Sequence, residues 1–337
     1  MANTCILNKD IYMLYNILFC LAGFLLLYYS AEWLVKGSSS LARNMGITPI
    51  VIGLTVVAFG TSAPELVVSL IAAIEDKNMM VLGNVIGSNI CNIALVLGLS
   101  AVFQPITSTG DVVKREIPIM LGVSLFLLIL SWNSIIGRVE GAVLFAGVIG
   151  YTLFNYRVAL KQKDRLKKDA DLFAGDNDKT GYIASRGMQI ILIISGIAGI
   201  ASGAKIIVFC AEKIMISLGV GEKLISLTLV AFSTSLPELT TSVVAAVKKE
   251  MDISIGNLIG SNVFNILSVL GIVSLIKPII ITGGFIKSGL MVDYLVMMFT
   301  SFIPWIMMRK DNTINRYNGI TLLICYSAYV IYLILTR

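Results

Sequence analysis

The chain carries the same block of residues twice, at a constant offset of 173 positions that relates Glu65 to Glu238. The first copy comprises Ala58–Glu65 and Gly83–Asn92, and the second comprises Ala231–Glu238 and Gly256–Asn265. Each copy reads Thr-Ser-x-Pro-Glu, then Gly-Asn-x-Ile-Gly-Ser-Asn-x-x-Asn, and each places a glutamate inside an apolar stretch. A carboxylate within a bilayer is costly and needs a partner or a function. Two glutamates in matched frames therefore predict one shared cation site.

The composition indicates a membrane protein with many spanning segments. Of the 337 residues, 57% are hydrophobic and only 14% are charged, and the mean hydropathy is +0.88. Soluble domains average about 25% charged residues. Histidine is absent, which excludes histidine-based zinc sites and Ser-His-Asp triads. No activated nucleophile is visible either, so the sequence indicates a protein that is not an enzyme and that uses no cofactor.

Ten apolar runs are long enough to cross the roughly 30 Å core of a bilayer. They are residues 12–35, 46–74, 79–103, 116–133, 135–159, 187–211, 221–247, 252–276, 286–308 and 316–335. A polar stretch divides the chain into a first five-helix repeat at 1–159, a linker at 160–186 and a second five-helix repeat at 187–337. Because five is odd, the second repeat enters the membrane from the opposite side. We therefore expect an all-α polytopic membrane protein with ten transmembrane helices in two inverted repeats, which bind substrate where they meet at the bilayer midplane.

The distribution of basic residues predicts the orientation in the membrane. The loops after odd-numbered helices carry more than twice as many lysines and arginines as the opposite face. The positive-inside rule then places both termini outside and the linker 160–186 in the cytoplasm of a multi-pass plasma-membrane protein. The net charge of +6 lies mainly in these loops, so it indicates topology rather than nucleic-acid binding. A monomer is compatible with the sequence, which leaves the oligomeric state open.

Each motif places a proline within a predicted helix. Proline removes one backbone hydrogen bond and clashes with the preceding turn. At membrane depth such breaks are tolerated where they line a cavity. We expect the freed carbonyls to come from about 58–61 and 231–234, and carbonyl oxygens are hard ligands of the kind that Ca²⁺ accepts.

The polar residues of each motif are spaced three or four positions apart and therefore share helix faces. The spaced pairs are Ser62 with Glu65, Ser88 with Asn92, Ser235 with Glu238, and Ser261 with Asn265. The motif glycines allow neighbouring helices to approach closely; they are Gly83, Gly87, Gly256 and Gly260. The matched positions supply only oxygen ligands, which suit Ca²⁺ with its about six to eight ligands. Two carboxylates balance one Ca²⁺ or two Na⁺, which is a chemical basis for exchange at a common site.

These paired motifs resemble the alpha-repeats of the sodium/calcium exchanger family, within the cation/calcium exchanger superfamily, and the chain looks like a prokaryotic member. The resemblance covers both five-helix halves. It implies broken helices 2, 3, 7 and 8 around a midplane ion site, with helices 1 and 6 sliding across them. It also implies sodium-driven calcium antiport by alternating access, with Na⁺ and Ca²⁺ as transported ions that compete for one site.

The resemblance further implies a role for each motif residue. Glu65 and Glu238 would be the central ligands of both ions. The remaining implied ligands are side-chain or backbone oxygens of Thr61, Ser62, Thr234 and Ser235, the outer sodium ligands Ser88 and Ser261, the flanking amides Asn92 and Asn265, and the carbonyls of Ala58 and Ala231.

The chain departs from the family pattern at its two flanking amides. Many members carry aspartate at one of the positions occupied here by Asn92 and Asn265. The site therefore holds two formal negative charges, which leaves sodium stoichiometry and proton competition open. A calcium/proton antiporter on the same fold remains an alternative, and a passive cation channel is a further one. The glutamates as hydrogen-bonded neutral acids, and the glycine segments as plain packing motifs, are the structural alternatives.

Overall fold

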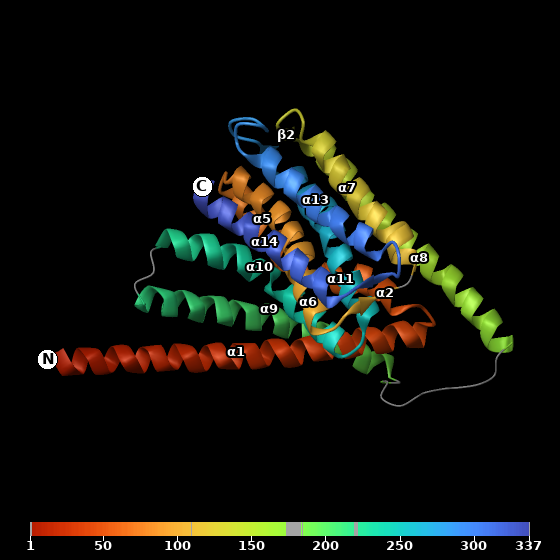
Figure 1. Ribbon diagram of the computed structural model, residues 1–337, viewed down its shortest axis with the longest axis horizontal. Coiled ribbons are helices and arrows are strands. Elements are labelled where there is room, and N and C mark those ends of the chain that lie inside the picture. Colours follow the sequence, from red (N-terminus) through yellow and green to blue (C-terminus); the bar gives the residue numbers. More distant parts are fainter. Residues whose placement is uncertain (1, 109, 173–182, 184, 219–221, 337) are drawn as a thin grey trace.

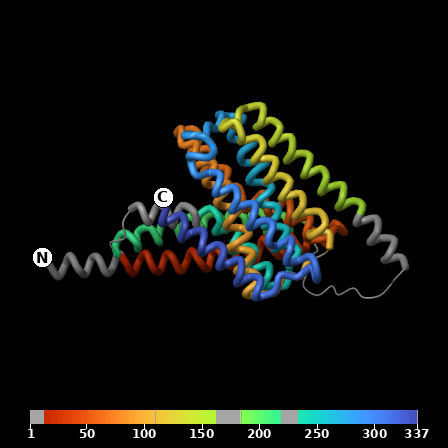
Figure 2. Tube along the Cα trace, turned by 45° about the horizontal axis from the view of Figure 1, so that its top comes forward, coloured from red at the N-terminus to blue at the C-terminus, as the bar shows by residue number. Residues whose placement is uncertain are grey.

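The protein is described by a computed structural model over residues 2–108, 110–172, 183, 185–218 and 222–336, and the side chains of 2–12, 162–172 and 222–232 lie outside this description. Two long helices, α1 (Ala2–Met45) and α9 (Arg186–Ser217), lie side by side along one edge of the molecule (Figure 1). Much of the remaining chain forms a bundle of helices that is inclined to this pair (Figure 2).

The remaining elements follow one another in two series with similar order. The first series is α2 (Pro49–Ile52), η1 (Gly53–Val57), α3 (Ala58–Thr61), α4 (Ala63–Ile74), α5 (Asn78–Ile90), η2 (Cys91–Leu97), α6 (Gly98–Phe103), β1 (Ile106–Thr107), η3 (Val112–Glu116), α7 (Ile117–Leu130), β2 (Ile135–Ile136) and α8 (Arg138–Leu172). The second series is α10 (Glu222–Val247), α11 (Met251–Phe264), η4 (Asn265–Leu270), α12 (Gly271–Ile276), β3 (Ile279–Ile280), α13 (Leu290–Met308), β4 (Thr313–Ile314) and α14 (Arg316–Thr336). The η elements are π-helical segments.

Helix α1 extends well beyond the predicted run 12–35. It continues to Met45 and ends at Gly46, whose φ of 70° lies in the left-handed region that favours glycine. Pro49 then starts α2. The predicted apolar run ended before Lys36, but lysine and arginine are good helix formers and do not end a helix.

Within the described residues, seven helical segments are long and apolar enough to cross a membrane, or up to eight if one bent pair, Pro49–Thr61 with Ala63–Ile74, counts as a single span. These segments match eight of the ten predicted runs. In the run 116–133 the helix α7 has only 14 residues. In the run 221–247 the side chains of α10 are described only in part. The chain is thus a multi-pass membrane protein, and its division into ten spans stays a prediction.

Interruptions mark three of the four helices that carry the motifs. The π-helical segments η2 and η4 directly follow α5 and α11, and the chain bends by 40° around Ser62, just before Pro64. π-Helical turns are frequent at functional sites. Helix α10 differs, because it continues through Pro237 as one helix. The break expected in helix 7 is therefore not found, whereas helices 2, 3 and 8 are interrupted.

Four two-residue strands accompany the helices, so the all-α prediction was incomplete. β1 pairs with β4, and β2 pairs with β3, both antiparallel. Ile106 in β1 and Ile279 in β3 are separated by the same 173 positions as the motifs. Strands of two residues show no alternating pattern in a sequence, which is why they escaped the prediction.

The two halves repeat tertiary contacts as well as sequence. Asn84 in α5 donates a hydrogen bond to the Ser69 hydroxyl in α4 at 2.9 Å. Asn257 in α11 donates to the Ser242 hydroxyl in α10 at 3.1 Å. Both members of the second pair follow the first by 173 positions. The repeat therefore extends to the way in which consecutive helices pack.

In the second half, the motif glycines bring α11 against the segment formed by α2, η1 and α3. A Cβ atom at Gly260 would lie 2.7 Å from both the Cβ of Ala58 and the carbonyl oxygen of Leu54. A Cβ atom at Gly256 would lie 2.9 Å from the carbonyl oxygen of Ile50. Side chains do not fit at such distances without movement of the backbone, so the predicted close approach is confirmed here.

The matched glycines of the first half have surroundings that are described only in part. The offset of 173 relates the residues packed against Gly256 and Gly260 to positions 223–231, whose side chains lie outside the description. The close approach expected for α5 therefore stays a prediction.

The close packing of α11 predicts different outcomes for two substitutions. Gly260→Ala should lower the free energy of unfolding by roughly 1–3 kcal/mol, because the methyl group overpacks a helix contact. Gly150→Ala in α8 should leave stability unchanged or raise it by up to about 1 kcal/mol, because alanine favours helix and its Cβ atom would meet no described atom within 4 Å. Thermal unfolding of the purified variants in detergent measures both effects. Equal stabilities of the two variants would contradict the close packing at Gly260.

Candidate ion-binding site

The polar residues of both motifs come together in the interior, where α3, α4 and α5 meet α10 and α11. All ten predicted side-chain ligands are no more than 4% exposed. They are Thr61, Ser62, Glu65, Ser88, Asn92, Thr234, Ser235, Glu238, Ser261 and Asn265. Of the two predicted carbonyl ligands, Ala58 is fully buried, and Ala231 lies in the part of α10 whose side chains are outside the description.

Glu65 lies in the first turn of α4, directly after the bend. The N–H groups of a first helical turn have no partner within the helix, and the helix dipole places partial positive charge there. Pro64 fits this position because a helix start does not need its missing N–H. The local sequence thus builds a helix start in the interior, which favours a negative charge on Glu65.

Glu238 receives hydroxyl groups from both halves of the chain. Ser62 donates to Glu238 Oε1 at 3.2 Å, and Ser261 donates to the same oxygen at 3.4 Å. Glu238 also lies close enough to Glu65 for the two carboxylates to interact electrostatically. The two acids therefore share one polar cluster, as the matched motif positions predicted.

Hydroxyl pairs continue this cluster on either side of the acids. Thr61 and Ser261 have their hydroxyl oxygens 3.3 Å apart, and Ser88 and Thr234 have theirs 3.5 Å apart. The two pairs are related by the offset of 173. The Ser261 hydroxyl also lies 3.5 Å from the carbonyl oxygen of Ala58. Each pair thus joins one residue of the first motif to one of the second.

Several buried oxygens of the cluster accept no hydrogen bond from any described residue. They are both carboxylate oxygens of Glu65, Oε2 of Glu238, the Ser235 hydroxyl, and Oδ1 of Asn92 and Asn265. Buried polar atoms are normally paired, because an unpaired one costs free energy. Oxygens that converge without donors are suited to a hard cation such as Ca²⁺ or Na⁺.

The sequence analysis missed three asparagines that lie in the same cluster. Asn89 and Asn262 bond to the flanking amides Asn265 and Asn92 at 3.1 Å each. Asn257 accepts a hydrogen bond from Thr61 at 3.0 Å. These asparagines are identical in the two copies of the motif, and that identity was the signal that was available.

Other metal chemistries find no support in the described part of the chain, which contains no group of three or more His, Cys, Asp or Glu side chains placed to hold a metal ion. The cluster instead combines two carboxylates with hydroxyl and amide oxygens. Such a set carries at most two formal negative charges. It therefore suits an ion that the site must release as well as bind.

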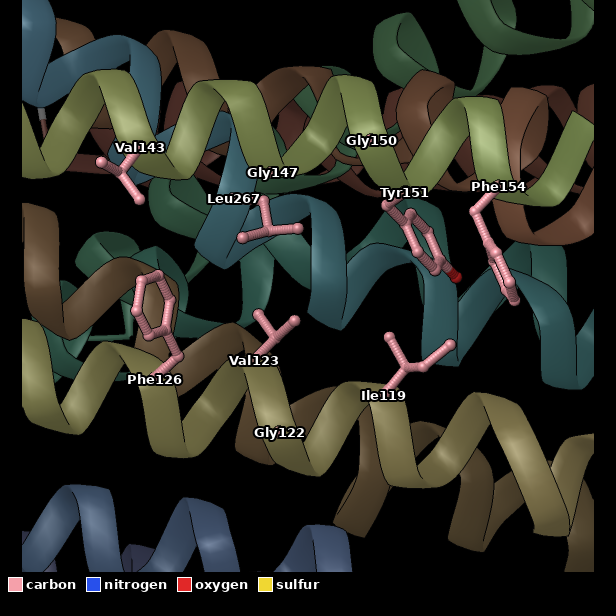
Figure 3. A pocket seen from close by; sticks show the side chains of 10 residues that line it. All are labelled: Ile119, Gly122, Val123, Phe126, Val143, Gly147, Gly150, Tyr151, Phe154 and Leu267. Atoms are coloured by element: carbon pink, nitrogen blue, oxygen red, sulfur yellow. The ribbon is translucent and has the colours of Figure 1, made fainter.

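An apolar groove between α7 and α8 is separate from this cluster (Figure 3). Leu267 of η4 lies at its floor, and Tyr151 carries the only polar side chain among the ten residues that line it. A surface lined in this way offers no ligands to a cation. We therefore take the buried cluster as the candidate ion site.

Comparison with known proteins finds a matching family and close relatives. A family model described as sodium/calcium exchanger protein matches residues 15–157 and 188–335. The sodium/calcium exchanger MaX1 of Methanosarcina acetivorans is 31% identical over an alignment of 349 positions. The alignment covers 94% of this chain and 98% of that protein. The inner membrane protein YrbG of Escherichia coli is 37% identical over 287 residues, which cover 84% of this chain and 85% of that protein.

A solved structure shows the same fold. The sodium-calcium exchanger NCX_Mj, soaked with zero Na⁺ and Ca²⁺, superimposes on this chain with a TM-score of 0.78. The two sequences are 32% identical, and the superposition covers 95% of this chain and 99% of the other.

The cluster predicts that calcium binding depends on both acids. Glu65→Gln and Glu238→Gln should each weaken calcium binding by more than about 100-fold, because changing a direct ligand should exceed the 10–100-fold cost of changing an outer residue. Folding should persist, because the amide has the same shape and carries no buried charge. Equilibrium binding of radioactive calcium to the purified proteins measures the effect, with the exposed Asp111→Asn as the control. Retention of wild-type affinity by either glutamine variant would remove that glutamate from the site.

Proposed function

Because the chain belongs to the sodium/calcium exchanger family, we propose that it is a sodium-driven calcium antiporter whose Na⁺ and Ca²⁺ compete for one site centred on Glu65 and Glu238. The observation that carries this proposal is the convergence of two buried carboxylates with unpaired oxygens from both halves of the chain. The transported ions are substrates of the protein.

The charge of the site fits alternation between the two ions. Two carboxylates balance one Ca²⁺ or two Na⁺, so either load leaves the interior close to neutral. Burial makes this balance important, because an uncompensated charge inside a membrane is costly. Binding of one ion species therefore favours release of the other, because either load alone neutralises the two carboxylates.

We assign the remaining ligands by their place around the acids. Thr61, Ser62, Thr234 and Ser235 would supply oxygens beside the carboxylates. Ser88 and Ser261, with the carbonyls of Ala58 and Ala231, would form flanking sodium sites, and Asn92 and Asn265 would present amide oxygens to the middle of the site. The support for this assignment is burial of the described members and the paired hydroxyls at 3.3 and 3.5 Å.

For the architecture we propose two inverted five-helix repeats, 1–159 and 187–337, joined by the linker 160–186. The tertiary contacts that recur at the offset of 173 support this division. Alternating access requires that one half be closed where its counterpart is open. In this proposal α1 and α9 slide together across the bundle.

The topology proposal is that both termini lie outside and that the linker lies in the cytoplasm, following the basic residues of the loops. Calcium then leaves the cell as sodium enters. Each Na⁺ that moves down a potential of 100 mV releases about 2.3 kcal/mol. Transport of more than two Na⁺ per Ca²⁺ would therefore let the membrane voltage drive extrusion.

Reconstituted vesicles test the coupling directly. Vesicles loaded with Na⁺ and diluted into sodium-free buffer with radioactive calcium should accumulate calcium, because outward sodium flow drives its entry. Glu238→Gln should abolish this uptake, and vesicles loaded with K⁺ should show none. A pH gradient replaces the sodium gradient in a parallel experiment. Calcium uptake that follows the pH gradient and ignores sodium would overturn the sodium claim in favour of calcium/proton antiport.

A further inference from the structure

Two asparagines from opposite halves exchange hydrogen bonds with each other's backbone. Asn89 Nδ2 donates to the carbonyl oxygen of Asn262 at 3.2 Å, and Asn262 Nδ2 donates to the carbonyl oxygen of Asn89 at 3.3 Å. Both side chains are at most 1% exposed. A backbone carbonyl can only accept hydrogen bonds. Each of these two amides must therefore turn its nitrogen toward the other half of the chain.

That constraint fixes the atoms that the two amides offer to their next neighbours. The amide oxygen of Asn89 faces Asn265 and accepts from its Nδ2 at 3.1 Å. The amide oxygen of Asn262 accepts from Asn92 Nδ2, also at 3.1 Å. An amide oxygen accepts only, so Asn92 and Asn265 must present their nitrogens here. Their own oxygens are thereby turned away, and neither accepts a hydrogen bond from a described residue.

We propose that Asn89 and Asn262 are positioning residues that turn the amide oxygens of Asn265 and Asn92, rather than their NH₂ groups, toward the transported cation. The proposal rests on the proposed function of this cluster as the ion site. An amide flipped by 180° would aim two N–H donors at a cation, which repels it. The orientation is set by backbone carbonyls, two hydrogen bonds away from the ion.

A substitution pair separates orientation from structure. Asn89→Ala should weaken equilibrium calcium binding by about 10- to 100-fold, the usual cost of losing an outer residue that orients a ligand. In an Asn265→Asp background the same Asn89→Ala change should cost much less, because a carboxylate has two equivalent oxygens and needs no orientation. Asn262→Ala with Asn92→Asp repeats the test at the matched site. Asn155→Ala is the control, because this buried asparagine bonds only within α8.

The outcomes are distinct. Equal losses for Asn89→Ala in the two backgrounds, or no loss in either, would overturn the positioning role while leaving the ion site in place. A wild-type protein that binds calcium but fails to exchange it for sodium would instead overturn the proposed function, and the binding comparison would still decide the positioning role.

A separate set of contacts joins the C-terminal part of the long helix α1 to the turn after α10. Lys248 pairs with Glu32 at 2.6 Å. Glu250 accepts a hydrogen bond from Ser39 at 2.7 Å and lies 3.6 Å from Arg43. These contacts join the α1–α9 pair to one end of the bundle.

The repeat gives these contacts counterparts with reversed charge. The offset of 173 relates Glu32 to Lys205, Lys248 to Glu75, Ser39 to Glu212, and Glu250 to Lys77. Lys205 and Glu75, the counterparts of Glu32 and Lys248, again carry opposite charges. Glu212 and Lys77, the counterparts of Ser39 and Glu250, also carry opposite charges. The turns also match in shape, because their central residues Asp76 and Lys249 have φ values of 62° and 63°.

The counterpart contacts are not made in this structure. Glu75 pairs with Lys77 inside its own turn at 2.7 Å. Lys205 and Glu212 form no ion pair with a described residue. The turn after α4 thus carries side chains whose expected partners lie on α9 and form no ion pair with them.

We infer that the two sets are alternating latches, so that Lys205–Glu75 and Glu212–Lys77 close when Glu32–Lys248 and Ser39–Glu250 open. This inference also rests on the proposed alternating access. Each latch would hold the α1–α9 pair against one end of the bundle.

Cysteine pairs test the latches in a variant without native cysteines. Glu32→Cys with Lys248→Cys should cross-link, and Lys205→Cys with Glu75→Cys should cross-link only when ions allow the opposite conformation, so the two yields should change in opposite directions. Glu32→Cys with Glu75→Cys is the control and should not cross-link. In addition, Glu75→Lys should slow exchange by roughly two- to fivefold, and adding Lys205→Glu should restore it.

Absence of the Lys205–Glu75 cross-link under every combination of Na⁺ and Ca²⁺ would overturn the latch. Cross-linking needs no transport, so this result is independent of whether calcium exchanges for sodium. If both cross-links form while vesicles show no sodium-driven calcium uptake, the latch stands and the proposed function falls.

Discussion

Two carboxylates buried side by side are the constraint on which the rest of the structure depends. Glu65 and Glu238 are fully buried and interact electrostatically. Such an arrangement is unfavourable without positive charge between the acids. The helix start at Pro64 and the hydroxyls that reach Glu238 lie around these two acids. In the proposed function the transported cation supplies this positive charge. The repulsion between the two carboxylates then favours binding of a cation, and either ion can replace the other.

The two halves solve the same problem with one sequence pattern and two sets of contacts. Glu238 accepts hydroxyl groups from Ser62 and Ser261, whereas neither oxygen of Glu65 accepts a bond from a described residue. This difference lies in conformation and not in sequence. A repeat protein that exchanges the roles of its halves needs this kind of asymmetry.

Much of the site could be predicted because the motif appears twice. Comparison of the copies selected ten side chains, and all ten are buried in the cluster. Asn89 and Asn262 were missed because a buried asparagine within a small-residue motif serves packing equally well, and only the structure shows their reciprocal bonds to backbone carbonyls. The close approach expected at Gly83 and Gly87 stays a prediction, because the side chains at the matched positions 223–231 lie outside the description. The extent of α1 was missed because its end depends on the φ of Gly46.

The central claim is that one buried site holds either ion in turn. Crystals soaked with Sr²⁺, a heavier analogue of Ca²⁺, allow the cation to be located by anomalous scattering. The account predicts one anomalous peak between Glu65 and Glu238 that fades as Na⁺ is added. A peak elsewhere, or one between the two acids that sodium leaves unchanged, would contradict it.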